Sequence, residues 1–275
     1  MRKKPGLNAK EAQCARQAAH CVVQTHQRLA DYVRAGHTLA QIDTHCAHIL
    51  KDLNCKSCFR HYRAGNLPPF PSYACLSLNQ CVVHGTATYE SRPIVDGDIL
   101  SIDIGVVHQG WIGDAAWTYA IGAVPDGAEP LMTCGKESLR RGIEQMQPGT
   151  PYLAWAREVQ TVAESEFGFH CVKGLGGHGI GRRLHGPPFV SNVDPSTDPN
   201  VYWEEALHLW KPGTLVAVEP MIAIGTGHTR NEPGKWPIYS ADDSLSVHYE
   251  ADVLITETGP ENLTAAMCEL PDVLA

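Results

Sequence analysis

Apolar side chains recur at helical spacing through the first part of the chain. Residues 9–34 are rich in Ala, Gln, Arg and Leu, and Val22, Val23 and Leu29 fall on one face of a helix. Gly36 follows as a stop signal, because glycine readily adopts the left-handed conformation that ends a helix. Residues 39–53 repeat the apolar spacing. We therefore expect two amphipathic helices with a break at Gly36.

The apolar period changes to two after Leu76. Residues 99–107 alternate large apolar residues with Ser, Asp and Gly, which is typical of a strand with two different faces. Gln109-Gly110 is a turn signal, and residues 111–121 are expected to return as the partner strand of a hairpin. Residues 60–75 are rich in proline and predict an irregular loop.

The second half of the chain repeats this order of elements. The spacing predicts a helix over 129–147, ended by Pro148-Gly149, another helix over 153–167, and strands at 215–219 and 245–256. Gly149 holds the place that Gly36 holds in the first half. We predict a single catalytic domain over 1–275. It has a short tail, 1–8, and two pseudo-symmetric halves, about 9–124 and 125–264, with a site between them.

Composition narrows the classes of partner. Lys plus Arg is 22 and Asp plus Glu is 30, a net charge of −8, without a long block of like charge. Such a surface argues against nucleic acid or anionic lipid as the main partner. There is no apolar stretch of the roughly 18 residues that span a bilayer. The basic start is not followed by a hydrophobic signal core, so we expect a cytoplasmic protein with no membrane partner.

The ten cysteines are interpreted as reduced thiols. Cys55-x-x-Cys58 has the spacing of half a zinc site. A second close pair of Cys or His ligands is missing, because Cys75 and Cys81 are poorly spaced for that role. A structural zinc site is therefore not predicted. Core packing is the simplest role for Cys14, Cys21, Cys46 and Cys134.

Two carboxylates lie on the predicted hairpin. With a two-residue loop, the numbers of two residues that face each other across the strands add up to an odd number. The numbers 103 and 114 also add up to an odd number, so Asp103 and Asp114 are expected on one face of the hairpin. Two carboxylates in apolar surroundings repel each other unless a cation lies between them. The alternative is that both side chains reach solvent at a strand end.

Three further segments carry candidate ligands. Gly174–Gly181 is a glycine-rich run around His178; it lacks the ending of a phosphate loop, and its small residues leave the imidazole accessible. A structural histidine in a turn is the alternative. Glu219 closes an apolar strand just before Pro220, and Glu250 interrupts a strand-like run. A buried glutamate is costly unless it is paired or bound to metal.

Taken together, these residues form a coherent ligand set. Four carboxylates and one imidazole suit a pair of divalent first-row cations such as Mn, Fe, Co or Zn. Four negative charges would balance two doubly charged ions. Without metal such a cluster should be unstable, because like charges are held together in a region of low dielectric constant.

These residues stand in motifs that resemble a known family. From about residue 9 to 264 the chain resembles type I methionine aminopeptidases, of the pita-bread fold in the creatinase/aminopeptidase superfamily. The resemblance implies an α+β fold in which two α–β halves surround a curved antiparallel sheet about a pseudo-twofold axis. The motifs that carry it are Ser77–Gly85, Ser101–Gly105, Gly113-Asp114, Gly177–Gly181, Glu219–Met221 and Tyr249-Glu250.

The resemblance also implies roles for single residues. One metal would be held by Asp103, Asp114 and Glu250, with Asp114 and Glu250 bridging to a second that His178 and Glu219 complete. His84 and His185 would contact the scissile peptide. A methionine pocket would be lined by Cys75, Phe70 and Trp236. Departures from the family pattern are Leu184 in place of an aromatic residue, Gly186-Pro187-Pro188 after His185, and a long stretch over 190–210.

The expected reaction is removal of the N-terminal methionine from peptides and nascent proteins. A hydroxide bridging two divalent cations would attack, Glu219 would shuttle its proton to the leaving amine, and His185 would polarise the carbonyl. A peptide or nascent-chain N-terminus is then the partner, with the ribosome as a further candidate. A monomer is expected by resemblance.

Two alternatives remain open from the sequence. A prolidase or Xaa-Pro aminopeptidase shares the five ligands, but such enzymes usually carry a separate N-terminal domain for which this chain has no room. A non-catalytic peptide-binding or ribosome-binding member of the fold would be expected to have lost ligands, and all five are present. A serine or cysteine hydrolase is poorly supported, since no Gly-x-Ser-x-Gly motif occurs and no thiol has an obvious histidine partner.

Overall fold

The computed structural model describes residues 6–275, so residues 1–5 of the predicted tail lie outside the described residues. The helices match the predicted segments, with small shifts at their ends. Their bounds are α1 Ala9–Ala30, α2 Leu39–Asp52, α3 Ala128–Glu144, α4 Leu153–Gln160, a π-helical continuation η1 Thr161–Glu166 and a short 3-10 helix η2 Ala265–Glu269.

Helix α1 begins with a capping box and ends earlier than predicted. The Asn8 side chain accepts the N–H groups of Lys10 and Glu11, while the Glu11 carboxylate accepts the Asn8 N–H. The helix ends at Ala30 instead of residue 34. The chain then turns, so that Gly36, with a φ of 90°, donates its N–H to the Ile94 carbonyl at 2.8 Å.

Two five-stranded sheets form the centre of the molecule. The first has the order β1-β4-β5-β16, with β2 also paired to β4, and the second has the order β15-β14-β9-β7-β8. The bounds in the first are β1 Lys56–Ser57, β2 Cys75–Leu78, β4 Ile99–His108, β5 Trp111–Ile121 and β16 Val273–Leu274. Those in the second are β7 Gly176–Gly179, β8 Gly186–Ser191, β9 Leu215–Val218, β14 Ala251–Thr256 and β15 Gly259–Asn262.

Two three-stranded sheets complete the fold. Their orders are β13-β10-β6 and β11-β12-β3. The bounds are β3 Cys81–Val83, β6 His170–Cys171, β10 Met221–Ala223, β11 Thr229–Asn231, β12 Ile238–Ser240 and β13 Ser246–His248. The predicted strand 245–256 is therefore wrong as one element. It is divided between two sheets, because the chain leaves β13 at Tyr249 and Glu250 and enters β14 at Ala251.

The predicted hairpin is confirmed by the register of β4 and β5. His108 pairs with Trp111 across a two-residue turn, and Gln109 and Gly110 both have positive φ, of 50° and 78°. Asp103 lies opposite Ala116, and Asp114 lies opposite Gly105. The two aspartates are therefore diagonal neighbours on one face of the sheet.

Backbone and side-chain hydrogen bonds join the two large sheets along β5. The Glu250 N–H donates to the Ala116 carbonyl at 2.9 Å. The Asp114 N–H donates to Asp252 Oδ2 at 3.0 Å. These contacts place the start of β14 beside the middle of β5, so that carboxylates from the two halves of the chain meet there.

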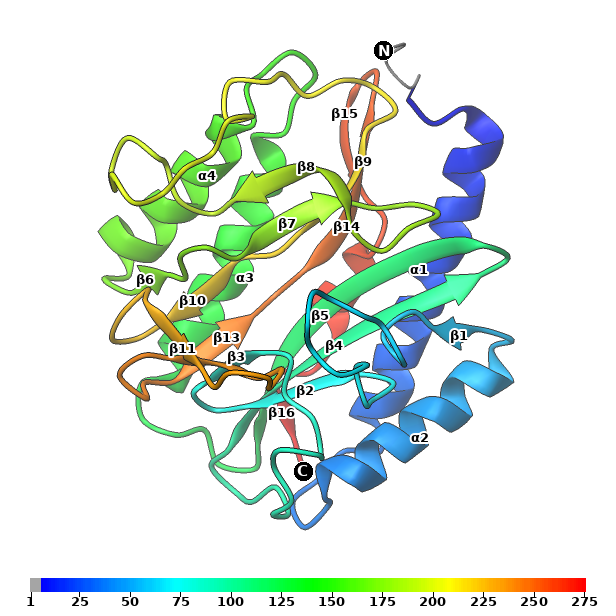
Figure 1. Ribbon diagram of the computed structural model, residues 1–275, viewed down its shortest axis with the longest axis vertical. Helices are drawn as coiled ribbons and strands as arrows, with labels where there is room; N and C mark the ends of the chain where they lie inside the picture. Colours follow the sequence, from blue (N-terminus) through cyan, green and yellow to red (C-terminus); the bar gives the residue numbers. More distant parts are fainter. Residues whose placement is uncertain (1–5) are drawn as a thin grey trace.

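Helices cover the sheets on the side away from this junction. Figure 1 shows α1 and α2 on one side of the molecule, with the first sheet, and α3 and α4 on the other side, behind the second sheet. Helix α1 packs closely on β5, since a Cβ on Gly113 would approach the Ala18 backbone to 2.6 Å. Within residues 6–275, no helix is long and apolar enough to span a bilayer.

The helix-helix-strand order of the two halves is matched in local detail. Gly36 and Gly149 have φ values of 90° and 87°. Each donates its N–H to a distant carbonyl, Gly36 to Ile94 at 2.8 Å and Gly149 to Trp210 at 2.9 Å. This agreement supports two related halves, as the internal repeat suggests.

Candidate active site

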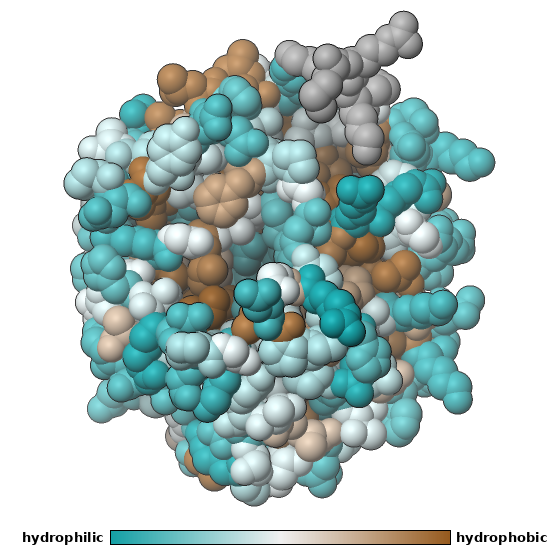
Figure 2. Space-filling model, in the orientation of Figure 1, coloured by the Kyte–Doolittle hydropathy of each residue, from teal (hydrophilic) through white to brown (hydrophobic). Residues whose placement is uncertain are grey.

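One cavity of about 530 Å³ opens between the two halves. In Figure 2, hydrophobic side chains gather in groups on either side of a recess in this face of the molecule. The cavity brings together every residue that the sequence assigns to the site: Phe70, Cys75, His84, Asp103, Asp114, His178, His185, Glu219, Trp236 and Glu250. Candidate metal ligands and candidate substrate contacts therefore share one chamber.

Asp103 and Asp114 enter the cavity from the middle of the first sheet. The two carboxyl groups are close enough to affect each other's protonation, and Cys75 lies opposite Asp103 where β2 pairs with β4. Burial raises the pKa of Asp103 to about 6, and burial together with the neighbouring carboxylates raises the pKa of Asp114 well above its ordinary value.

His178 lies on β7 between two positions, 177 and 179, that have room only for glycine. A Cβ on Gly177 would overlap the Ala217 carbonyl oxygen of β9, and one on Gly179 would overlap the Pro187 carbonyl oxygen of β8. Because these glycines let three strands approach closely, His178 is held at the cavity wall. Its Nε2 lies 4.0 Å from Asp114 Oδ2 and 4.0 Å from Glu219 Oε1.

Glu219 and Glu250 occupy breaks between strands. Glu219 lies between β9 and β10, and Glu250 lies between β13 and β14. Both positions leave the strand ladder, which turns the side chain into the cavity instead of a sheet face. The pKa of Glu250 is raised well above its ordinary value by burial first and then by the charges of Asp114 and Glu219.

The donor set fits divalent cations. Ligand atoms of Asp114, His178 and Glu250 all lie within 4.8 Å of one another, and a second group formed by Glu219, His248 and Glu250 shares Glu250 with the first. Among residues 6–275, buried Asp103 Oδ1 and Asp114 Oδ1 have no hydrogen-bond partner. Unpartnered carboxylate oxygens beside other carboxylates are stabilised by a positive ion, which supports the predicted metal centre.

The two predicted catalytic histidines flank this cluster. The pKa of His84 and that of His185 are each lowered to about 4, mainly because the cleft removes solvent from the charged imidazolium, so both rings are neutral near pH 7. His185 Nδ1 lies 2.7 Å from the Tyr62 hydroxyl, and its ring meets that of His178 edge to face at 4.4 Å.

An apolar pocket adjoins the carboxylate cluster. The rings of Phe70 and Trp236 meet edge to face at 5.2 Å, and the His84 ring meets that of Trp236 at 5.7 Å. The Trp236 indole N–H donates to the Pro68 carbonyl at 2.8 Å, which fixes the ring. The packed cluster also contains Phe59, Cys75 and Leu184. Leu184, the departure from the family pattern, is thus part of the pocket wall.

Sequence analysis missed three polar residues of the site. His248 is 3% exposed, with Nε2 3.1 Å from Glu219 Oε2 and 3.9 Å from Glu250 Oε2. Asp252 is 1% exposed, and burial raises its pKa to about 8. Tyr62 contacts His185. The signal for the first two was available, because polar residues at both 248 and 252 flank Glu250 within an apolar run.

The thiols behave differently from one another. Cys58, the other half of the Cys55-x-x-Cys58 pattern, packs against Gly105 on the face of the sheet that carries the aspartate pair. Burial, and then the nearby carboxylates, raise the pKa of its thiol well above the ordinary value. Cys55 lies elsewhere, 3.5 Å from His108 Nδ1. The statement that no thiol has a histidine partner is therefore wrong, because the partner comes from a distant strand.

Comparisons with known proteins agree on one family. The sequence model of Metallopeptidase family M24 matches residues 13–257. A methionine aminopeptidase of Clostridium acetobutylicum is 34% identical over 263 residues, which cover 95% of this chain and 98% of that protein. The crystal structure of methionine aminopeptidase from Rickettsia prowazekii matches with a TM-score of 0.85 and 27% identity, covering 94% of this chain and 99% of that one.

A more distant structure shares the fold alone. The prolidase of Pyrococcus horikoshii OT3 matches with a TM-score of 0.70 and 18% identity, covering 94% of this chain and 63% of that one. Together with the Rickettsia structure, it confirms the predicted α+β pita-bread fold.

Proposed function

The chain belongs to metallopeptidase family M24, and we propose that it removes the N-terminal methionine from peptides and nascent proteins, using two divalent cations and the residues of the cavity. The predicted family and enzyme class are confirmed by relatives that are named methionine aminopeptidase. The observation that carries the proposal is the meeting of five ligand-type side chains and an apolar pocket in one cavity.

The cations would be divided among the five ligands. Asp103, Asp114 and Glu250 would hold one, and His178 and Glu219 would complete the other, with Asp114 and Glu250 shared. The proximity of Asp114, His178 and Glu250 supports this assignment. When bound, the cations supply Lewis-acid activation of a water molecule and polarisation of the scissile carbonyl. Mn, Fe, Co and Zn all suit the donors.

Glu219 is our candidate for moving the proton. Its side chain borders the cavity and is 13% exposed, so it reaches both the buried cluster and a bound peptide. It would accept a proton from the attacking water and deliver it to the leaving amine. The imidazole Nε2 of His248 lies 3.1 Å from Oε2 of this carboxylate.

His185 is our candidate for stabilising charge on the carbonyl oxygen. Its ring is neutral near pH 7 because its pKa is lowered to about 4. The Tyr62 hydroxyl lies 2.7 Å from Nδ1. We assign it as the donor in this contact, which would place the ring proton on Nε2, free to donate to the substrate. His84 would contact the peptide from the opposite side, next to Trp236.

The apolar pocket would select the side chain. Methionine is unbranched and carries a polarisable thioether, which suits a pocket of aromatic rings and a thiol. Phe70, Cys75 and Trp236 supply these groups and are each almost fully buried. A free N-terminal amine beside the carboxylate cluster would restrict cleavage to the first residue.

Peptide cleavage separates this function from its rivals. We expect release of methionine from Met-Ala-Ser by Mn²⁺-loaded protein and little or no cleavage of Ala-Pro peptides. Preferential cleavage of Ala-Pro would instead assign the protein to the Xaa-Pro class, whose fold it shares. Tight peptide binding without cleavage of either would point to a non-catalytic member. Cytoplasmic location, a monomeric state and contact with the ribosome stay predictions.

A further inference from the structure

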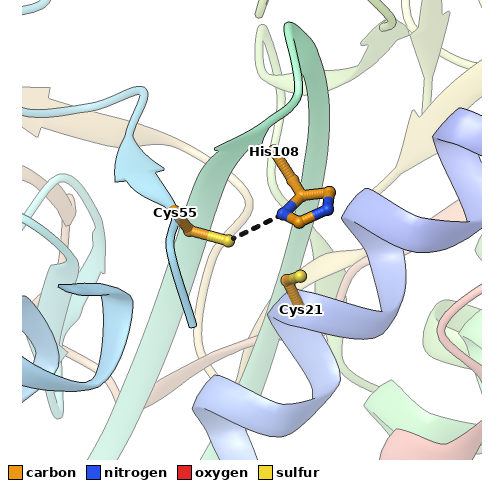
Figure 3. A group of neighbouring side chains, drawn as sticks. All are labelled: Cys21, Cys55 and His108. Carbon is orange, nitrogen blue, oxygen red and sulfur yellow. Dashed lines mark hydrogen bonds between the residues drawn. The ribbon is translucent and has the colours of Figure 1, made fainter. Parts of the chain in front are cut away.

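A group of two thiols and one imidazole lies outside the cavity. Cys21 comes from the middle of α1, Cys55 from the segment between α2 and β1, and His108 from the last position of β4. Figure 3 shows the three side chains converging from these separate elements. Their ligand atoms all lie within 4.8 Å of one another, and Cys55 Sγ is 3.5 Å from His108 Nδ1.

This group is distinct from the catalytic centre. His108 stands five residues beyond Asp103 on the same strand, which corresponds to about 17 Å at the usual rise of a β-strand. The three side chains are not among the residues that line the cavity. Their donor atoms also differ, because thiols and imidazole replace the carboxylates of the cleft.

The spacing matches that of ligands around a tetrahedral zinc ion. With metal–sulfur bonds of about 2.3 Å and metal–nitrogen bonds of about 2.0–2.1 Å, a sulfur and a nitrogen on one ion lie about 3.5 Å apart. That is the separation of Cys55 Sγ and His108 Nδ1. Two thiolates and an imidazole prefer a soft or borderline cation to the hard ions that carboxylates bind.

We propose that Cys21, Cys55 and His108 form a second metal site, for a thiophilic divalent cation such as Zn²⁺, with water as the fourth ligand. The site is close to the surface, since Cys21 and Cys55 are 7% and 8% exposed and His108 is half-buried. A bound ion would tie α1, the end of α2 and the tip of the β4–β5 hairpin together.

The hairpin turn supplies an outer contact that orients the imidazole. The side-chain amide nitrogen of Gln109 lies 3.0 Å from Nε2 of His108, and Nδ1 on the other side of the ring faces Cys55. Rotating the amide places its oxygen at Nε2, where it accepts the ring proton and frees the Nδ1 lone pair for a cation. Metal-bound histidines commonly have such a partner on the second nitrogen.

A thiol–disulfide pair is the other chemistry open to two close cysteines. Burial is the main cause that raises the pKa of the Cys55 thiol, to about 12. Without metal, this thiol is therefore almost wholly protonated at neutral pH and reacts slowly in exchange. A bound cation removes that barrier to ionisation, because a coordinating thiol loses its proton.

Cobalt spectroscopy of the full-length, reduced protein tests the proposal. Co²⁺ bound by thiolates gives a charge-transfer band that carboxylate ligands do not give. We expect this band, with the intensity of one thiolate-bound Co²⁺ per chain, in the unaltered protein and in the control Cys14→Ser, which alters another thiol of α1. The band should be lost in Cys21→Ser and Cys55→Ser. Gln109→Ala, at an exposed position, should weaken Zn²⁺ binding by about 10–100-fold.

Three outcomes would overturn the second metal site. The first is absence of the band in the unaltered protein, and the second is persistence of the band in Cys55→Ser. The third is a Cys21–Cys55 disulfide, detected by mass spectrometry under non-reducing conditions as the loss of two hydrogen atoms. Zn²⁺ affinity unchanged by Gln109→Ala would contradict the orienting contact. None of these readouts depends on peptide cleavage, so the proposal stands or fails separately from the catalytic function.

Discussion

Burial, followed by repulsion between neighbouring carboxylates, is the main constraint on the individual acidic residues of the cavity. Asp103, Asp114 and Glu250 are each at least 90% buried, and their pKa values are raised above the ordinary range for carboxyl groups. In the metal-free protein these raised pKa values favour a proton retained among the carboxyl groups. Divalent cations would replace that proton and allow all the carboxylates to ionise.

The residue most open to a direct test is His185. We expect His185→Ala to lower the rate of methionine release by about 10²–10³, the usual effect of losing one donor to a developing oxyanion. Bound metal, measured by elemental analysis, should be unchanged, because the ring is assigned to the substrate and not to the ions. Loss of metal in this variant would move His185 into the ligand set.

Tyr62→Phe provides the matched comparison. It removes only the hydroxyl that lies 2.7 Å from His185 Nδ1 and keeps the aromatic ring in place. The loss of rate should be smaller than for His185→Ala, since the imidazole remains but its tautomer is no longer fixed. A loss as large as that of His185→Ala would mean that the phenol itself contacts the reacting peptide.

At the scale of elements, the glycine-rich strand β7 determines whether His178 reaches the cavity. Gly177→Ala places a methyl group against the Ala217 carbonyl of β9. We expect a loss of stability of about 1–3 kcal/mol, as in other overpacked sites, together with weaker metal binding. Thermal unfolding and bound-metal analysis measure the two effects.

Gly186→Ala is the control for this substitution. Its Cβ would lie 3.5 Å from the Gly179 carbonyl oxygen, an ordinary contact, and its φ is not in the left-handed region. Its stability should fall much less than that of Gly177→Ala. Equal destabilisation by both would show that the close approach of β7 and β9 is not what excludes a side chain.

The same elements show what sequence patterns predict well. The β4–β5 hairpin was predictable because strict alternation and the Gln109-Gly110 turn are local signals, and parity alone placed Asp103 and Asp114 on one face. The division of residues 245–256 between two sheets was not predictable, although Glu250 interrupts this strand-like segment. What divides them is a distant contact, the hydrogen bond from the Glu250 N–H to the Ala116 carbonyl of β5.

At the scale of the whole molecule, the site exists only where the two halves meet. Asp103 and Asp114 come from the first half, while His178, Glu219 and Glu250 come from the second. Each is an acidic residue or a histidine in an apolar or glycine-rich segment, and this setting is what made them candidate ligands. The Cys21–Cys55–His108 group was hidden, since its members are brought close only by the packing of helices against the sheet.

The buried titratable groups predict a pH dependence of stability for the metal-free protein. His84 and His185 have folded pKa values of about 4, below the 6.5 of an unfolded histidine. Protonation of these two residues below pH 6.5 therefore favours the unfolded chain, so the free energy of unfolding increases as pH rises to 6.5 and their effect on it is constant above that pH. The carboxyl groups act in the opposite direction. Asp252, with a folded pKa of about 8, keeps a proton that the unfolded chain has already released, so its contribution falls as pH rises toward 8.

Between pH 6.5 and 8 only the carboxyl effect should remain. We expect Tm of the metal-free protein to fall across this range, by about 2–4 °C for each kcal/mol lost. Mn²⁺-loaded protein should change less, because cations stabilise the ionised carboxylates. Calorimetric scans of both forms give the comparison, and a metal-free Tm that rises from pH 6.5 to 8 would contradict the assigned protonation of the cavity.

The central claim is that carboxylates from both halves and one imidazole hold paired cations that make water reactive. Its most direct test is the initial rate of methionine release from Met-Ala-Ser by chelator-treated protein, recorded against the number of Mn²⁺ ions bound per chain. Mn²⁺ is preferred because it favours carboxylate oxygens over thiols. The account predicts no release without metal and a full rate when two ions are bound. Release at the full rate from metal-free protein would contradict it.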